Sequence, residues 1–272
     1  MSNAFTRSLA MSCVAVALLA GAATAQDAQP YKPELRQPGK DVMWLPSAQA
    51  LVDRMLDMAK LTVDDYVIDL GSGDGRTVIT AAKRGAKGLG IEYNPGLVAH
   101  SRSNAKAAGV EHLATFVEGD IFKSDFSAAS VVAMFLLADL NLQLRPILLD
   151  MKPNTRVVSN TFDMDDWKPD AQVSVEGTNG CTFHCEAFLW IVPAKVAGTW
   201  QLPEGELMLE QTYQMLRGTL KTPGGTTAIT NGKMRGDQIT FMVGDRIYNG
   251  RATDNRMEGV FSTETRWQAT RR

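Results

Sequence analysis

Hydrophobic residues between positions 66 and 162 form a regular alternation of two kinds of segment. Short apolar runs of β type occur at 66–70, 88–93, 114–119, 130–136 and 155–162. Helical stretches are expected at 76–84, 95–108 and about 140–150, between these runs. Such strand–helix alternation predicts an α/β domain whose parallel, Rossmann-like sheet is covered by helices on both faces.

The segments on either side of this alternation extend the same domain to residues 47–194. Ser47 is expected to cap a helix over 47–60, whose apolar residues follow helical spacing. Farther along, the runs 171–177 and 181–192 flank Thr178-Asn179-Gly180, which predicts an antiparallel hairpin at the edge of the sheet.

Residues 195–272 show a different pattern, with short alternating segments that glycine turns separate. The segments include "GTWQL", "QITFMV" and "RIYNGRATD", and no convincing helix lies among them. The pattern predicts a small antiparallel β-rich domain, as a meander, a sandwich or a half-barrel.

The first 25 residues have the features of a secretory signal peptide. Arg7 precedes the apolar run "LAMSCVAVALLAGAA", which is followed by Ala23-Thr24-Ala25. The prediction is cleavage after Ala25 and an exported, periplasmic protein with a Pro-containing lead-in at 26–46. The alternatives are an uncleaved anchor and a misassigned start codon. The run is too short to span a membrane comfortably, so no transmembrane segment is expected after cleavage.

Composition narrows the possible partners. The chain has 272 residues, of which 44% are apolar, and a formal net charge of −2. This is enough for one large core and a second, smaller one. The charge gives no electrostatic case for a nucleic acid partner, so a small-molecule or protein substrate is expected.

The stretch "VIDLGSGDGR" at 67–76 places Gly71, Gly73 and Gly75 directly after a predicted strand. The dinucleotide-binding fingerprint is G-x-G-x-x-G, and here the third glycine comes one residue early. The Gly-Lys-Ser/Thr ending of a phosphate-binding P-loop is absent from this stretch. A glycine turn alone is as consistent with a structural loop as with a cofactor site.

Acidic residues around this turn suggest which cofactor it would hold. Asp69 and Asp74 would repel a pyrophosphate but suit a positively charged amino group. S-adenosylmethionine (SAM) carries an ammonium and a sulfonium and has no phosphate. Ser72 lies in the same loop and is included in the predicted cofactor site.

Two more acids follow the next two predicted strands. Glu92 can accept hydrogen bonds from both ribose hydroxyls, and Asp120 can accept one from the adenine amino group, with Ile121 covering the ring. Tyr93 and Asn94 complete the predicted cofactor site. Each acid alone could be an ordinary strand end or turn former. However, three acids at successive carboxyl ends of strands lie where open α/β sheets bind ligands.

These motifs resemble those of class I (seven-strand) SAM-dependent methyltransferases. The stretches "WLPS", "VIDLGSGDGRTVITAAKRG", "GIEYNPGLV" and "ATFVEGDIFKSDFS" resemble lysine methyltransferases that act on the c-ring protein of the mitochondrial ATP synthase and on the adenine nucleotide carrier. "TRVVSNTF" is more weakly similar to non-SET histone lysine methyltransferases. The resemblance implies the strand order 3-2-1-4-5-7-6, with strand 7 antiparallel. The β-rich tail and the signal peptide depart from that family.

The methyl acceptor is expected at the ends of the fourth and fifth strands. Phe135 and Leu136 belong to an apolar lip at the end of the fourth strand, and Asn160 and Phe162 lie at the end of the fifth. The apolar lip argues against the Asn-Pro-Pro-Tyr type of amide or base methylation. Asn160 could orient an amine through its carbonyl group or could make only a structural hydrogen bond. The acceptor is therefore predicted to be an amine, and the resemblance implies a protein lysine.

Two other functions remain open at this point. The first is an exported, non-catalytic Rossmann-like protein whose β-rich tail binds an envelope partner. The second, more distant, is a role that depends on NAD. Measuring whether the purified protein binds SAM distinguishes the methyltransferase from these two alternatives.

Cys181 and Cys185 are the only cysteines after residue 25. On a regular strand they would face the same side but lie too far apart to bond, so two buried thiols are expected first. A disulfide would need a bend between them. A metal site with His184 is the third possibility, although His184 would point to the opposite face of a strand.

Overall fold

The computed structural model describes residues 44–261 and 265–272. The predicted signal peptide and most of the lead-in at 26–46 lie outside the described residues. No helix within these two ranges is long and apolar enough to cross a membrane.

The first part of the chain forms a seven-stranded mixed sheet with the strand order β3-β2-β1-β4-β5-β7-β6. β7 runs antiparallel to both β5 and β6, while the other neighbours are parallel. This order confirms the prediction. In sequence order the strands are β1 (Tyr66–Leu70), β2 (Lys87–Glu92), β3 (Ala114–Glu118), β4 (Val131–Met134), β5 (Arg156–Asn160), β6 (Ala171–Ser174) and β7 (Glu186–Ile191).

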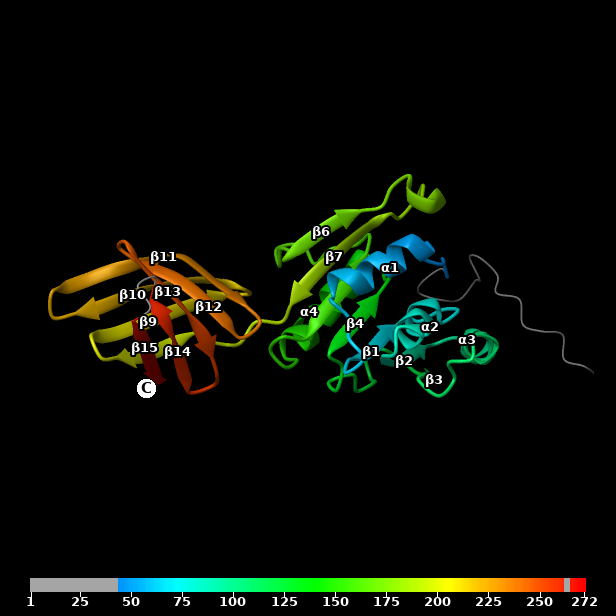
Figure 1. Ribbon diagram of the computed structural model, residues 1–272, viewed down its shortest axis with the longest axis horizontal. Coiled ribbons are helices and arrows are strands. Elements are labelled where there is room, and N and C mark those ends of the chain that lie inside the picture. The colour runs from blue at the N-terminus through cyan, green and yellow to red at the C-terminus, as the bar shows by residue number, and fades with distance from the viewer. Residues whose placement is uncertain (1–43, 262–264) are drawn as a thin grey trace, which may run out of the picture. The chain divides into compact units, whose positions relative to one another are not determined.

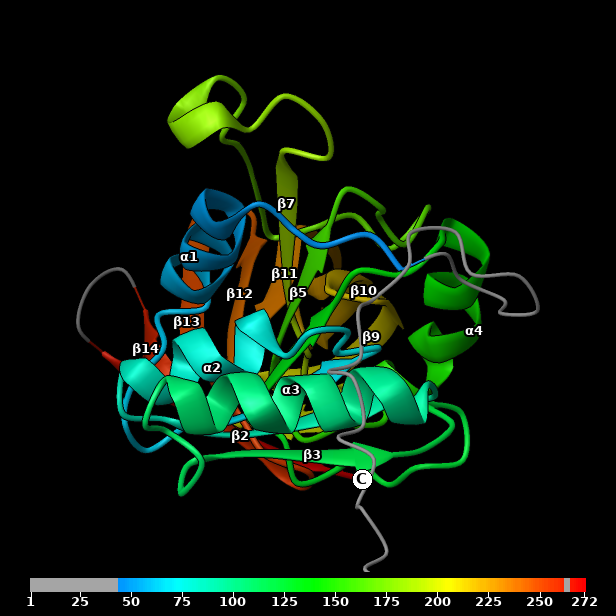
Figure 2. The ribbon, with the colours of Figure 1, turned by 90° about the vertical axis from the view of Figure 1, so that its right-hand side faces the viewer.

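Four helices cover the two faces of this sheet. They are α1 (Gln49–Met58), α2 (Arg76–Lys83), α3 (Pro95–Ala107) and α4 (Ala138–Leu149). Figure 2 shows α1 and α4 on opposite sides of the central strands. The side chains agree, because Val67 packs with Leu51 of α1 while Ile68, its neighbour on β1, packs with Leu144 of α4. A central strand buried on both faces is therefore mainly apolar, as β4 is throughout and β1 is apart from Tyr66 and Asp69.

The capping prediction for α1 was wrong. The helix begins at Gln49, its N-cap is Ala48, and no side chain caps it. Ser47 instead contacts two distant elements: its hydroxyl accepts a hydrogen bond from Asn160, and its carbonyl accepts one from Arg76. These tertiary hydrogen bonds hold the chain ahead of α1 against the ends of β5 and α2.

The C-terminal part forms a closed antiparallel barrel, drawn in yellow to red in Figure 1. Its strands are β8 (Gly198–Leu202), β9 (Gly205–Thr212), β10 (Met215–Thr222), β11 (Gly225–Arg235), β12 (Gln238–Val243), β13 (Arg246–Ala252), β14 (Arg256–Phe261) and β15 (Arg266–Arg271). β15 pairs with β8, which closes the ring. Of the three antiparallel arrangements expected, a meander that closes on itself is therefore the one observed.

Aromatic side chains fill the centre of the barrel. Trp200, Phe241, Tyr248 and Trp267 are each at most 4% exposed. The rings of Phe241 and Tyr248 stack with centroids 4.5 Å apart. The indole of Trp200 donates to the Val196 carbonyl at 2.8 Å, so its polar atom is satisfied within the core. Trp200 and Trp267 are therefore core residues of the barrel.

The expectation of free thiols was also wrong, because Cys181 and Cys185 form a disulfide. β7 begins only at Glu186, so the two cysteines lie in the loop of the β6–β7 hairpin, after a short 3-10 turn at Thr178–Gly180. His184 adopts a left-handed backbone with φ 54°. This bend brings the two Cα atoms to 6.0 Å, within the range a disulfide requires.

Candidate functional site

The glycine-rich turn between β1 and α2 requires all three of its glycines. Gly71, Gly73 and Gly75 have φ values of 78°, 55° and 82°, which other residues rarely adopt. A Cβ on Gly75 would lie 2.7 Å from the side chains of Phe116 and Ser101. The third glycine thus lets α2 begin close to β3 and α3.

Glu92, at the end of β2, is held in place by backbone groups. Its Oε2 accepts a hydrogen bond from the Gly73 N–H at 2.9 Å, and its Oε1 accepts one from the Asn94 N–H, also at 2.9 Å. Each carboxylate oxygen has two acceptor positions, so both retain capacity for a hydroxyl donor. A fixed carboxylate with two open acceptor sites suits a ribose diol, which is the role that the sequence analysis predicts for Glu92.

Asp69 is a buried carboxyl at the end of β1, only 5% exposed. Burial raises its pKa to about 7, and the nearby charges of Glu92 and Asp74 act in the same direction. A hydrogen bond with Thr77 opposes this shift but does not cancel it. A cationic ligand would favour the ionised form, so this carboxyl is suited to respond to an ammonium group.

Asp74, which was predicted to face the cofactor, is bound to Arg76. The guanidinium Nε donates to Asp74 Oδ1 at 3.0 Å, and the same arginine donates to the Ser47 carbonyl. The Asp74 carbonyl accepts a hydrogen bond from Asn104 at 3.0 Å. These contacts tie the glycine turn to the segment before α1 and to α3, and they leave less of the Asp74 charge for a ligand.

Two other predicted cofactor residues have clear roles in the local structure. Ser72 Oγ is buried against β2, since a Cβ on Gly90 would lie 2.5 Å from it, and it has no hydrogen-bond partner in the described residues. Asn94 caps α3 by accepting a hydrogen bond from the Gly96 N–H at 3.0 Å, as its place before Pro95 predicts.

At the end of β3, Asp120 accepts a hydrogen bond from the Phe122 N–H at 2.9 Å and pairs with Lys123 at 3.0 Å. The Phe122 hydrogen bond and Lys123 lower its pKa, so it is ionised at neutral pH. Ile121 packs partly buried beside Leu70 and Ile91 of the core. Tyr93 is 65% exposed after β2. The predicted adenine and ribose residues therefore follow adjacent strand ends.

Trp44 is a further residue at this turn that the sequence did not single out. A Cβ on Gly73 would lie 2.6 Å from the Trp44 indole nitrogen, so the ring lies directly against the turn. The "WLPS" stretch was noted only as part of the family resemblance. Its contact with the turn is tertiary and has no local pattern.

The predicted acceptor residues lie together beside the same turn. Leu136 is the side chain that a Cβ on Gly71 would touch, at 3.0 Å. The rings of Phe135 and Phe162 are 6.4 Å apart. Asn160 is fully buried, donates to Ser47 Oγ at 2.8 Å and accepts from the Thr161 hydroxyl at 2.8 Å.

His184 joins this group from the disulfide-closed loop. Its ring contacts those of Phe135 and Phe162, with centroids 5.2 Å and 5.9 Å away. The sequence suggested only a metal role for His184, and no cluster of three potential metal ligands occurs in residues 44–261 and 265–272. The contact depends on the bend at residues 181–185, which periodicity could not reveal.

The disulfide should matter for this loop and much less for the glycine turn. Replacing both Cys181 and Cys185 by serine is expected to lower the free energy of unfolding by about 2 kcal/mol, the loop-closure estimate for so short a ring. Urea denaturation measures this change. Calorimetry should give an unchanged Kd for SAM, while the KM of the methyl acceptor rises. A weakened SAM affinity would contradict this division.

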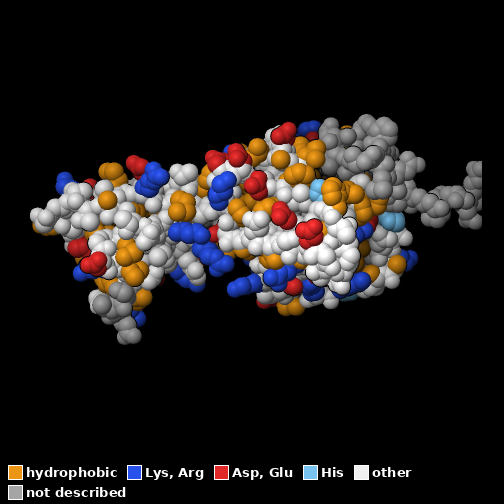
Figure 3. Space-filling view, turned by 90° about the horizontal axis from the view of Figure 1, so that it is seen from above, with side chains coloured by type: hydrophobic (Ala, Val, Ile, Leu, Met, Phe, Trp, Pro, Cys, Tyr) orange, Lys and Arg blue, Asp and Glu red, His pale blue; other side chains and the backbone are white. Residues whose placement is uncertain are grey.

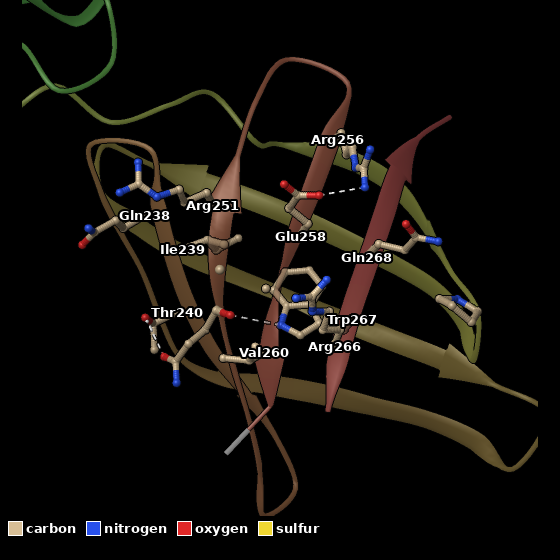
Figure 4. Close-up of a pocket in the computed structure, with 14 residues that line it drawn as sticks. Gln238, Ile239, Thr240, Arg251, Arg256, Glu258, Val260, Arg266, Trp267 and Gln268 are labelled. Atoms are coloured by element: carbon tan, nitrogen blue, oxygen red, sulfur yellow. Dashed lines mark hydrogen bonds and ion pairs between the residues drawn. The ribbon is translucent and has the colours of Figure 1, made fainter. Parts of the chain in front are cut away.

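A separate groove of about 960 Å³ lies on strands β12 to β15 of the barrel. Figure 4 shows Arg256 paired with Glu258, and the Trp267 indole directed at the Asn249 carbonyl. All the residues that line it follow position 202, so it takes in none of the predicted cofactor or acceptor residues.

The residues of the glycine turn and strand ends fit SAM. Three carboxyl groups lie at the ends of the adjacent strands β1, β2 and β3. Asp69 is buried and suited to a cation, Glu92 is held in place and suited to the ribose, and Asp120 is ionised and suited to the adenine amino group. When bound, SAM supplies an electrophilic methyl group on sulfur. Glu92, Asp69 and Asp120 would hold it, with Leu136 against the glycine turn at Gly71.

Comparison with known proteins agrees with this fit. The family model described as the ANTKMT methyltransferase domain matches residues 69–171. A protein-lysine N-methyltransferase from Saccharolobus islandicus is 43% identical over 141 residues, which cover 51% of this chain and 88% of that protein. The human lysine N-methyltransferase of the ATP synthase c-ring protein is 41% identical over 112 residues, which cover 41% of this chain and 48% of that protein.

A solved structure is similar over the same region. It is the crystal structure of an RNA methyltransferase from Salinibacter ruber in complex with S-adenosyl-L-homocysteine, 45% identical, with a TM-score of 0.52. The match covers 56% of this chain and 96% of that one. The chain thus spans nearly all of two relatives but about half of the human one. The chain belongs to the SAM-dependent methyltransferases, in the family of the protein-lysine N-methyltransferase from Saccharolobus islandicus.

Proposed function

We propose that this methyltransferase transfers the methyl group of SAM to the ε-amino group of a protein lysine. The observation that carries the proposal is the 43% identity to a protein-lysine N-methyltransferase across most of that protein's length. The predicted acceptor residues Phe135, Leu136, Asn160 and Phe162, called the acceptor mouth below, also support it. The rings of Phe135 and Phe162 suit an aliphatic chain that ends in a cationic or neutral amine.

An apolar mouth also suits the chemistry of the transfer. The reaction displaces sulfur in line and removes a positive charge, so the protein must mainly align the groups and exclude water. Leu136 lies against Gly71, so the apolar lip directly borders the cofactor turn. The intact set of Asp69, Glu92 and Asp120 favours catalysis over the alternative of a non-catalytic binding protein.

Comparative proteomics tests the acceptor class. Proteins from the native host and from a strain that lacks this gene are digested and searched for mass increments of 14 Da. The expected result is one or more lysines methylated only in the wild type, restored by the intact gene and not by a Glu92→Ala variant. Methylation of RNA nucleosides instead, the acceptor class named for the Salinibacter structure, would overturn the proposal.

We also propose that the chain is exported, on the strength of the pattern at residues 1–25. N-terminal sequencing of the protein from its native host should begin at or near Gln26. A start at Met1 or Ser2 would overturn export. The face shown in Figure 3 carries both acidic and basic side chains with apolar ones between them, as is usual for a protein with a small net charge.

A further inference from the structure

His184 lies in the loop of the β6–β7 hairpin, beside the acceptor mouth. The Cys181–Cys185 disulfide closes this loop around it, and a backbone hydrogen bond from Val175 N to Cys185 O at 2.9 Å fixes the base of the loop. The left-handed backbone of His184 turns its side chain towards β5. The position of this imidazole is therefore set by covalent and backbone constraints together.

Aromatic rings surround the imidazole. Phe135 follows β4, Phe162 follows β5, and Phe183 precedes His184 with centroids 3.9 Å apart. Phe183 is 73% exposed and His184 is partly buried, so the group lies at the surface end of the mouth. An aliphatic amine that entered between Phe135 and Phe162 would meet His184.

Hydrogen bonds determine which imidazole nitrogen carries the proton. The Thr161 hydroxyl donates its one proton to Asn160 Oδ1 at 2.8 Å, because an amide oxygen can only accept. His184 Nδ1 lies 3.0 Å from the same hydroxyl oxygen, so Nδ1 must be the donor in this contact. The Nε2 atom of the neutral ring is then unprotonated and able to accept a proton.

This chain of hydrogen bonds continues into the buried core. Asn160 Nδ2 donates to Ser47 Oγ at 2.8 Å, and Asn160 itself is fully buried. The orientation of Thr161, and through it the tautomer of His184, is therefore fixed from the end of β5. Desolvation lowers the pKa of His184, and no charged side chain in the described residues contributes to that shift.

A lysine acceptor must lose a proton before it can attack, and a base at the mouth would speed this loss. The ordinary pKa of a lysine ammonium is about 10.4, so only about one molecule in a few thousand carries a free amine at pH 7. The ammonium has no lone pair with which to attack a methyl carbon. Phe135, Phe162 and Leu136 offer no proton acceptor, and Asn160 Nδ2 is a donor. His184 Nε2 is the unprotonated nitrogen at this mouth.

We propose that His184 is the base that removes a proton from the substrate ammonium, an inference that rests on the proposed amine acceptor. The ammonium N–H bond breaks and the proton passes to Nε2, which gives an imidazolium whose Nδ1–H remains on Thr161. The amine lone pair then forms the N–CH₃ bond as the C–S bond breaks and its electrons go to sulfur. The imidazolium finally releases its proton to water.

The test compares His184→Asn with His112→Asn. Asparagine tolerates the left-handed backbone at residue 184, and His112 is an exposed histidine, which makes it the matched control. Poly-L-lysine is the acceptor, SAM is saturating, and kcat is measured from pH 6 to pH 10. Calorimetry should show an unchanged SAM affinity in both variants.

Wild type and His112→Asn should show a nearly level kcat above pH 7. For His184→Asn we expect kcat at pH 7 to fall about 100-fold, with a tenfold rise per pH unit as the solvent deprotonates lysine. An unchanged pH profile in an active His184→Asn variant would overturn the inference and leave the proposed function intact. Failure of the wild type to methylate any lysine would overturn both.

A second readout does not depend on activity. Imidazole ¹⁵N shifts should show His184 as the Nδ1–H tautomer in the wild type at pH 8. The Thr161→Val variant should lose this preference. Added n-butylamine should perturb Nε2 selectively in the wild type. A wild-type His184 in the Nε2–H tautomer would overturn the inference even if His184→Asn failed to fold.

Discussion

Replacing Glu92 by alanine is expected to weaken SAM binding by at least about 100-fold. The lost interactions are the two hydrogen bonds that a carboxylate would accept from the ribose hydroxyls, together worth about 3 kcal/mol. The variant also releases the N–H groups of Gly73 and Asn94, which the carboxylate now orders. Isothermal titration calorimetry at pH 8 measures the change directly.

Glu118→Ala is the matched control. Glu118 pairs in register with Glu92 on the neighbouring strand, and its side chain is exposed. Its removal should leave the SAM affinity within about twofold of the wild type. An equal loss of SAM affinity in both variants would show that Glu92 contributes only negative charge at this edge of the sheet and makes no specific hydrogen bonds to the ribose.

The second large effect is expected for Asp69→Asn, which should stabilise the protein while it abolishes tight SAM binding. The raised pKa of about 7 means that, between pH 4 and pH 7, the folded protein keeps a proton that the unfolded chain loses. The free energy of unfolding therefore falls as the pH rises through this window. The neutral asparagine removes this penalty.

Urea denaturation at two pH values tests this account. At pH 8, Asp69→Asn should unfold with a free energy about 2 to 4 kcal/mol above that of the wild type, and at pH 4 the two should nearly coincide. In the wild type, the Kd for SAM should rise about tenfold per pH unit below pH 7, as the carboxyl is protonated. A destabilised Asp69→Asn variant, or a Kd independent of pH, would contradict the role of Asp69.

Local sequence patterns predicted the strands and helices of the sheet, while the order of its strands came from the family resemblance. Strands such as β1 are apolar runs of the right length, and Asn94-Pro95 is a strong helix start, so periodicity and capping agreed with the final fold. The acids Asp69, Glu92 and Asp120 could be assigned to one edge because parallel strands place their carboxyl ends together. The sequence predicted antiparallel strands in the C-terminal part, but it did not show that the last strand pairs with the first to close a barrel.

Features that depend on contacts between distant residues were missed. Ser47 has the chemistry of a helix cap, but Asn160 and Arg76 bind it instead. The disulfide and the position of His184 both follow from a bend in the hairpin loop, which strand periodicity does not show.

We propose that one edge of the sheet holds SAM beside a mouth that accepts a lysine amine. The most direct measurement incubates the purified protein with SAM and poly-L-lysine at pH 8 and analyses the acid hydrolysate by mass spectrometry. The account predicts Nε-methyl-lysine from the wild type and from Glu118→Ala, and none from Glu92→Ala. Tight SAM binding by the wild type without any methylated lysine would contradict it.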